Sequence, residues 1–265
     1  MNFKREFPLL MAFWIGVFSA HAEDVVINEV LYNPETDSRY EFIELYNPTS
    51  SPVDLHGFAC TEGIQFPFPS GAVIQPASFL LLVKDPTLKN WQTVQVPLFG
   101  PYDGKLANDG ERLTLRGPDN RLVDSFEYAD GLPWPRGADG YGSSLERISA
   151  DLPSEDYHSW RASLQTDGTP GSQNSVVGIP PFPLIRSFQC SPSYPTSSDS
   201  VDVRIALDAP DRIQEVVLCV ELHPNAGVVS SATTQMARIE GNTEEAVFQS
   251  AIPPCTSQTL VRFYL

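Results

Sequence analysis

The chain has 265 residues, enough for one large domain or two of ordinary size. Its 33 acidic residues outnumber its 17 lysines and arginines, and a formal net charge of −16 repels phosphate backbones, which argues against a nucleic-acid-binding protein. Hydrophobic residues make up 42% of the chain, so it can form real cores, while 24 prolines and 17 glycines interrupt it too often for long helices. The composition therefore predicts an acidic, mostly β protein.

The first 22 residues have the pattern of a secretory signal peptide. Lys4 and Arg5 precede an apolar run at 7–20, and residues 20–22 have the small-x-small form of a cleavage site. A transmembrane helix is the alternative, but the run is shorter than the roughly 20 residues that span a bilayer, and an acidic pair follows at once. We expect an exported protein whose mature chain begins at Glu23 and has no membrane span.

After the signal, short runs of alternating apolar and polar residues are separated by turn residues. This alternation is typical of β-strands, and spacings of roughly ten residues favour a sandwich or a barrel. Asp-Gly pairs at 103–104, 109–110, 130–131 and 139–140 are typical of tight turns between strands. The predicted strands of this part are 24–32, 39–47, 53–60, 72–74, 79–83, 111–117, 121–128 and 143–148.

A stretch rich in glycine, proline and small polar residues, 166–183, has the composition of a linker. Alternation resumes near Leu184, and five runs follow. We place a first domain at 23–175, a linker at 176–183 and a second β domain at 184–265. The five runs of the second domain are 201–207, 213–222, 232–241, 245–252 and 259–265.

If the chain is exported, its four cysteines could form disulfides, because oxidising compartments permit them. Three of them, Cys190, Cys219 and Cys255, lie in the second domain, and Cys60 lies alone upstream. A bridge from Cys190 or Cys219 to Cys255 and buried free thiols are equal alternatives, and we expect Cys60 to stay free. No Cys-x-x-Cys pair or Cys/His cluster is present, which argues against zinc.

Five ordered blocks of the first domain together form a recognisable pattern: 27–34, 40–58, 106–128, 134–148, and Gly168-Thr-Pro-Gly-Ser-Gln-Asn174 after Trp160. These blocks resemble the lamin tail domain family, in its bacterial secreted form. The resemblance implies an immunoglobulin-like β-sandwich over about 24–175, although His56 and Cys60 depart from the family pattern. The second domain resembles, more generically, the immunoglobulin- or fibronectin-like modules that follow such domains. The fold class is therefore all-β, with two sandwiches.

The acidic residues suggest a metal site and a carboxylate pair, and we weigh both against structural roles. Calcium favours several oxygen ligands, but the D-x-[DN]-x-[DN]-G pattern is absent and Asp-Gly pairs are ordinary turns, so we predict no metal site and no cofactor. Glu29, Glu41 and Glu44 could serve glycoside chemistry, but we interpret them as a solvated face or strand-end partners. The calcium candidates are Asp103, Asn108, Asp109, Glu111, Asp124, Asp130 and Asp139.

Within each strand, period-two alternation sets the direction of the side chains. Phe42, Glu44 and Tyr46 should point to one face, and Ile43 and Leu45 to the other.

Trp134 and Trp160 are expected to be buried plugs at the ends of the sandwich, with an exposed sugar-binding platform as the alternative. The histidines of the mature chain, His56, His158 and His223, are interpreted as structural. No nucleophile elbow, zinc-protease motif, phosphate loop or kinase signature occurs, so we predict no catalytic residues and no enzyme activity.

These features favour an exported, non-catalytic binding or scaffolding protein whose partner is a protein or a cell-surface polymer. We expect it outside the cell or on its surface, with the periplasm as an alternative. Two other functions remain open: the accessory N-terminal part of a larger cell-surface enzyme of the spore-coat-protein-H-like kinase type, and a calcium- or glycan-binding module.

The second domain offers five runs where a sandwich needs about seven strands, and its last run ends on apolar residues. We therefore expect the chain to continue past Leu265. The alternative is that Leu265 is the true end and that the first domain or a dimer partner covers the last strand.

Overall fold

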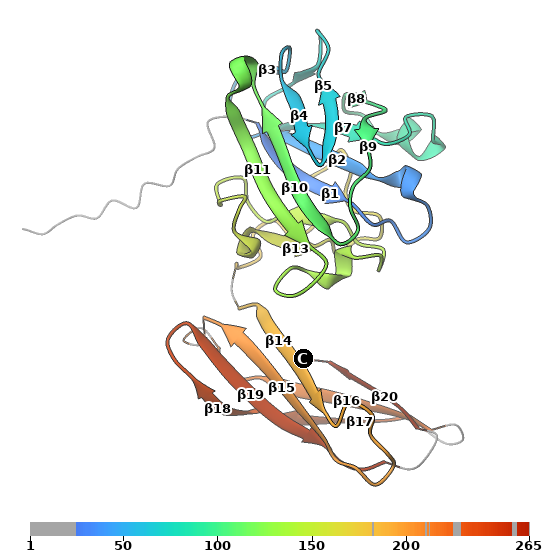
Figure 1. Ribbon diagram of the computed structural model, residues 1–265, viewed down its shortest axis with the longest axis vertical. Helices are drawn as coiled ribbons and strands as arrows, with labels where there is room; N and C mark the ends of the chain where they lie inside the picture. Colours follow the sequence, from blue (N-terminus) through green and yellow to red (C-terminus); the bar gives the residue numbers. More distant parts are fainter. Residues whose placement is uncertain are drawn as a thin grey trace, which may run out of the picture.

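The computed structural model describes residues 25–265, apart from 182, 210, 212, 225–228, 256–258 and 265. Figure 1 shows two β-sandwich domains, the first formed by β1–β13 and the second by β14–β20, which confirms the all-β prediction. The predicted signal peptide, 1–22, lies outside the described residues. In the described part of the chain, no helix is long and apolar enough to cross a membrane.

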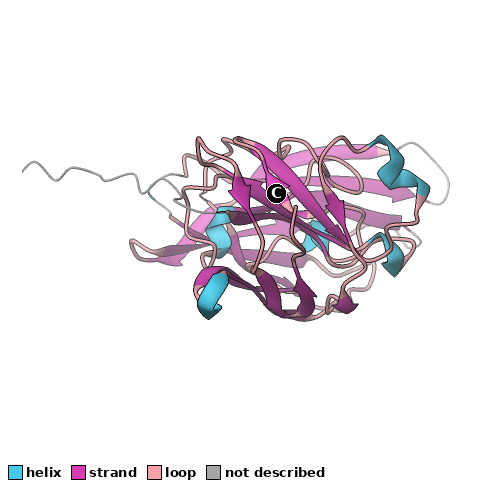
Figure 2. Cartoon of the chain, turned by 90° about the horizontal axis from the view of Figure 1, so that it is seen from above, coloured by secondary structure: helices cyan, strands magenta, loops and turns pink. Residues whose placement is uncertain are grey.

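The helical segments are single short turns of 3₁₀ helix. Figure 2 shows them in the connections between strands. Frequent prolines and glycines explain why no described segment continues as a longer helix. The turns are η1 (Ser38–Tyr40), η2 (Lys89–Thr93), η3 (Pro118–Asn120), η4 (Arg136–Ala138) and η5 (Tyr157–Ser159).

The first domain packs two main sheets face to face. One sheet has the order β13-β12-β1-β2-β7-β8, the other has the order β11-β10-β4-β5-β9, and β3 pairs with β6 beside them. The strands are β1 (Val26–Leu31), β2 (Phe42–Asn47), β3 (Val53–Asp54), β4 (Ala59–Glu62), β5 (Ile64–Pro67), β6 (Val73–Ile74), β7 (Ser78–Val83), β8 (Leu98–Phe99), β9 (Asp103–Gly104), β10 (Gly110–Arg116), β11 (Leu122–Ala129), β12 (Leu145–Arg147) and β13 (Trp160–Ala162).

The core lies between these two sheets, and the predicted alternation of β2 is confirmed. Ile43 and Leu45 belong to the core cluster between the sheets, while Phe42 packs on the opposite face of the sheet. Trp160 is fully buried and stacks on Phe126 with ring centroids 4.2 Å apart. Trp134 is only half-buried but also packs against Phe126, so the prediction of a buried plug holds for Trp160, and neither tryptophan is among the exposed large hydrophobic residues.

Some predicted elements of the first domain were wrong in detail. The run 53–60 forms two separate strands, because Gly57 takes a φ of +84° and breaks the extended chain. The pair Asp103-Gly104 is a strand, β9, that pairs with β5, and not a turn. Strands β5, β8 and β13 were missed because each is only two to four residues long, too short for alternation to show.

The outer face of the six-stranded sheet is covered in two places by segments that contain no long element. The segment 84–98 covers an apolar cluster, into which it inserts Trp91. The stretch 168–176 covers the next part of the face, and its residues Thr169, Asn174 and Val176 are buried. The composition of 166–175 was therefore misleading: this stretch packs as part of the first domain and is not a free linker.

The described residues of the second domain form seven strands in two sheets, where alternation had indicated five. One sheet has the order β14-β15-β19-β18 and the other β17-β16-β20. The run 232–241 divides at Met236, which is buried in the core, and its two halves join different sheets. Strand β14 was missed because most of its side chains are exposed. The strands are β14 (Ile185–Ser191), β15 (Val201–Asp208), β16 (Val217–Pro224), β17 (Ser230–Gln235), β18 (Ala237–Gly241), β19 (Glu245–Ile252) and β20 (Thr259–Tyr264).

Polar contacts tie the two domains together at the linker. Arg161 Nη2 donates to the carbonyl oxygens of Pro180 and Pro181, at 3.0 and 2.8 Å. Across the junction, His158 Nε2 lies 2.5 Å from Asp208 Oδ2, and the other oxygen of Asp208 accepts from the backbone N–H of Leu184 at 2.7 Å. These contacts fix both ends of the short connection.

All four cysteines lie among the described residues, and none is bridged in the structure. Cys60 is buried in the core of the first domain, and its burial raises the pKa of the thiol to about 12. A thiol of this kind packs as a small apolar side chain.

Candidate functional site

Three glutamates stand side by side on neighbouring strands of the six-stranded sheet. Glu29 of β1 pairs in register with Glu146 of β12 on one side and with Glu44 of β2 on the other. All three side chains are fully buried. We call Glu146, Glu29 and Glu44 the carboxylate row.

The carboxylate row is covered by residues 168–176, which we call the cover loop. Backbone N–H groups of this loop donate to each carboxylate in turn: Thr169 to Glu29 at 2.8 Å, Gly171 to Glu44 at 2.6 Å and Val176 to Glu146 at 3.2 Å. The hydroxyl of Thr169 donates to Glu146 Oε1 at 2.8 Å and lies 3.2 Å from Glu29 Oε2. The row therefore holds the loop down by main-chain hydrogen bonds.

The cover loop lies close to the carboxylate row, and Gly168 is the loop residue for which this closeness matters most. Gly168 has a φ of +81°, which disfavours any residue with a side chain. A Cβ atom there would also collide with Glu29 Oε1 and with the Ser144 side chain. Glycine is thus required both by the backbone angle and by the space above Glu29.

Burial is the main cause of the raised pKa of two members of the row, Glu29 and Glu44. It raises the pKa of Glu29 to about 7, although hydrogen bonds from Ser144 and Thr169 lower it, and the charge of Glu146 adds to the rise. Burial also raises the pKa of Glu44 well above its usual range, and the charge of Glu29 raises it further. The two neighbouring carboxylates resist full ionisation together, so Glu29 and Glu44 retain protons near neutral pH.

A β-bulge next to the row brings a further polar side chain onto the same face. The pairing of β1 with β2 shifts between Ile27 and Glu29, which leaves Asn28 as the extra residue. Asn28 Nδ2 donates to Glu44 Oε1 at 2.8 Å and to Asn174 Oδ1 at 2.7 Å. Asn174 in turn donates to the backbone oxygen of Asn28 at 3.0 Å and to that of Arg147 at 2.8 Å. The end of the cover loop is therefore joined to the bulge.

A buried ion pair satisfies the backbone that the bulge leaves open. Arg147 Nη1 donates to Asp124 Oδ2 at 3.0 Å and to the carbonyl oxygen of Ile27 at 3.3 Å. The same Asp124 oxygen accepts from the N–H of Ile27 at 2.8 Å. Both partners are more than nine-tenths buried, so the pair links β11 of one sheet to β1 and β12 of the other.

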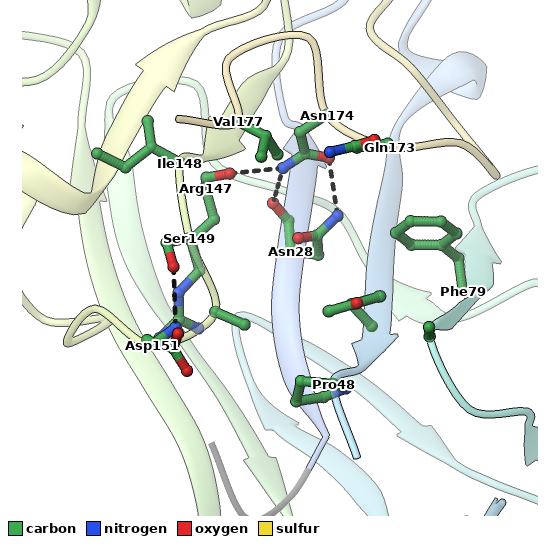
Figure 3. Close-up of a pocket in the computed structure, with 13 residues that line it drawn as sticks. Asn28, Pro48, Phe79, Arg147, Ile148, Ser149, Asp151, Gln173, Asn174 and Val177 are labelled. Atoms are coloured by element: carbon green, nitrogen blue, oxygen red, sulfur yellow. Dashed lines mark hydrogen bonds between the residues drawn. The ribbon is translucent and has the colours of Figure 1, made fainter. Parts of the chain in front are cut away.

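A pocket of about 520 Å³ opens beside this network. Figure 3 shows Phe79 and Gln173 on one side, Arg147, Ser149 and Asp151 on the opposite side, and Asn28 and Asn174 between them. A mixed lining of this kind is typical of small-molecule sites, whose volumes fall in the same range. The remaining lining residues are Tyr46, Pro48, Ala77, Ile148, Ala150 and Val177.

The structure corrects the interpretation of the three candidate glutamates. Glu29 and Glu44 are not on a solvated face, because the cover loop buries them. Glu41 is also buried and accepts from the Tyr102 hydroxyl and the Leu106 N–H, both at 3.0 Å. Sequence reasoning missed Glu146, Asn28, Asn174 and Arg147, and the Gly168–Asn174 block was the signal that could have drawn attention to them.

The calcium candidates are not brought together. Asp124 pairs with Arg147, Asp139 accepts from Asn33 Nδ2 at 2.7 Å, and Glu111 accepts from the Ala107 N–H at 2.7 Å. Within the described ranges, no group of three or more His, Cys, Asp or Glu side chains could hold a metal ion. The remaining candidates are exposed: Asp103, Asn108, Asp109 and Asp130.

The histidines lie apart from the pocket lining. His158 is at the domain junction, between Asp156 and Asp208. His223 Nε2 lies 3.1 Å from Glu221 in the second domain, and His56 is exposed in a turn.

Two packed sheets with this pairing define the first domain as an immunoglobulin-like β-sandwich. Residues 19–130 match the family model of the Lamin Tail Domain, and the first domain therefore belongs to the lamin tail domain family. The match ends before β12 and β13, which complete the six-stranded sheet. No curated protein and no solved structure matches the chain.

The raised pKa of Glu29 makes stability depend on pH. The native state binds the extra proton, so the free energy of unfolding falls as pH rises from about 4.5 to about 7. Glu29→Gln keeps an acceptor oxygen for Thr169 and removes this titration. We expect the variant to gain roughly 1–3 kcal/mol relative to the parent chain between pH 5 and pH 8, measured by urea unfolding. The exposed Glu35→Gln serves as the control and should show no such trend. Parallel pH profiles for the parent and Glu29→Gln would contradict the assignment.

Gly168→Ala tests the contact between the loop and the row. Gly178 has nearly the same backbone angle, φ +82°, but nothing lies within 4 Å of the position of its Cβ. Gly178→Ala should cost about 1 kcal/mol, from backbone strain alone. Gly168→Ala should cost roughly 1–3 kcal/mol more, because Glu29 and Ser144 must move. If thermal or urea unfolding shows the same loss of stability for Gly168→Ala and Gly178→Ala, the cover loop is not in close contact with Glu29.

Proposed function

We propose that this chain is an exported, non-catalytic binding protein, built from a lamin tail domain and a second β-sandwich, whose ligand is a protein or polymer of the cell surface. The predicted signal peptide supports export, and the family supports a role in interaction, since lamin tail domains are immunoglobulin-like modules that often mediate contacts. We further propose that it belongs to the bacterial secreted type, on the basis of the Gly168–Asn174 block.

The observation that carries the proposal is the pocket beside the carboxylate row. Its lining comes from a sheet face and from two segments that buried hydrogen bonds hold in place, namely 147–151 and 173–177. Rigid positioning lowers the entropy cost of binding, and surface segments held by a sandwich are common binding sites.

The surroundings of the buried glutamates support a binding role and not a catalytic one. Glu29 and Glu44, register partners on β1 and β2, accept hydrogen bonds from Thr169 and Gly171 under the cover loop. A general acid or nucleophile must reach its substrate, and these oxygens face the protein's own main chain. Their role is to position the loop that forms one wall of the pocket.

Binding to cell-envelope material tests the proposal. The chain is secreted from Met1 in a bacterial host, recovered with Glu23 at its amino terminus, and mixed with washed envelope fragments. We expect saturable sedimentation with the fragments, weakened at least about tenfold by Phe79→Ala in the pocket. Tyr141→Ala, an exposed aromatic of the same domain, is the matched control and should bind as the parent does. Unprocessed protein retained in the cytoplasm, or the absence of saturable binding, would contradict the proposal.

A further inference from the structure

We infer that the pocket binds an uncharged glycan, with a sugar ring lying on Tyr46 and Phe79. The inference rests on the proposed binding function and names the chemistry of the ligand. It depends on three properties of the lining: an aromatic pair on the sheet face, hydrogen-bonding groups at its edge that the fold leaves unused, and the lack of an available cation among the lining residues.

The aromatic pair is built by the register of two strands. Tyr46 of β2 lies opposite Phe79 of β7, and their ring centroids are 5.0 Å apart with planes inclined by 32°. Both rings are half-buried and line the pocket. They follow Glu44 on the same outer face, at the point where the cover loop ends its contacts with the sheet.

This position explains why the pair remains accessible. The outer face is covered first by 84–98 over apolar side chains and then by the cover loop over the carboxylate row. The rings of Tyr46 and Phe79 make no hydrogen bond or ring contact with either covering segment in the described part of the chain, and both remain partly exposed in the pocket. A pyranose ring presents an apolar face of C–H groups, which packs on an aromatic surface of this shape, while its hydroxyls point outward from the edge.

Polar groups for those hydroxyls surround the aromatic pair. Asn28 is 7% exposed, and among the described residues its Oδ1 accepts no hydrogen bond, because only its Nδ2 is used. The side-chain amide of Gln173 and the hydroxyl of Tyr46 likewise make no hydrogen bond within the described part of the chain. These groups line the pocket and have hydrogen-bonding capacity left over, so a ligand hydroxyl can donate to the oxygen of Asn28 and pair with Gln173 or Tyr46.

Charge favours an uncharged ligand over an acidic one. Arg147 is the cation of the lining, but it is 4% exposed, and its Nη1 and Nη2 groups already donate to Asp124 and to the carbonyl oxygen of Leu152. Asp151 at the rim is an acid, and the whole chain has a net charge of −16. An anionic sugar would therefore meet repulsion and no available positive partner.

The arrangement also favours a sugar over an extended peptide. Peptides that bind sandwiches commonly add a strand to an open sheet edge, where the main chain supplies the hydrogen bonds. Here the hydrogen-bonding groups are the side chains of Asn28 and Gln173, and the apolar contact is the flat face of a sheet. Side-chain amides around an aromatic surface fit ring hydroxyls better than a peptide backbone.

Calorimetric titration of the mature chain tests the inference. The probes are cellohexaose, chitohexaose, maltohexaose, xylohexaose and mannohexaose as uncharged oligosaccharides, with hexagalacturonate as the acidic one and a casein digest as the peptide source. We expect at least one uncharged probe to bind. Its affinity should fall at least about tenfold in Tyr46→Ala and in Phe79→Ala, and stay unchanged in the exposed Tyr141→Ala.

A second measurement does not depend on how the variants fold. In the parent chain, the bound probe should shift the side-chain amide NMR signals of Asn28, Asn174 and Gln173. The inference is overturned if no uncharged probe binds at millimolar concentration, if only hexagalacturonate or the peptides bind, or if binding leaves those signals and the Tyr46 and Phe79 variants unaffected.

The same variants separate this inference from the proposed function. If envelope binding depends on Phe79 but no uncharged sugar binds, the inference of a glycan ligand is wrong, while the proposed binding function stands. If envelope binding is absent altogether, the proposed function itself fails, whatever the sugar titrations show.

Discussion

Three glutamate side chains, Glu146, Glu29 and Glu44, are buried next to one another on adjacent strands, and a buried carboxyl group is costly unless hydrogen bonds satisfy its oxygens. The protein meets this cost in two ways. The cover loop supplies a backbone N–H to each side chain, and burial raises the pKa of Glu29 and Glu44 so that the row retains protons near neutrality. The position of residues 168–176 on the sheet follows from these requirements.

The pocket depends on the same arrangement. Asn28, displaced by the bulge, joins Glu44 to Asn174, and Asn174 joins the end of the cover loop to the backbone of Arg147. Arg147 then reaches Asp124 in the other sheet. One continuous set of buried hydrogen bonds therefore holds both walls of the pocket. Such networks are demanding, because each unsatisfied member is costly. In this one, among the described residues, the buried Nε of Arg147 has no hydrogen-bond partner.

Much of the fold could be predicted from the sequence, since Phe42 to Tyr46 alternate as the strand requires and the blocks of the first domain resemble lamin tail domains. The site could not. Alternation shows that Glu44 faces away from the core, but it does not show whether a segment more than 120 residues later covers that face. The composition of Gly168–Asn174 is that of a linker, and its packing depends on acceptors supplied by distant strands. Met236 marks a change of sheet that a continuous alternating run conceals.

Hydrogen exchange of three backbone amides tests the central claim most directly. The N–H groups of Thr169, Gly171 and Val176 donate to Glu29, Glu44 and Glu146 and lie outside every strand. If the carboxylate row holds the cover loop, these amides should be protected to nearly the same degree as the paired amides of β2, because both open only when the domain unfolds. Exchange as fast as that of the exposed turn at Gly131 would contradict the account, since the loop would then leave the row without unfolding of the sheet.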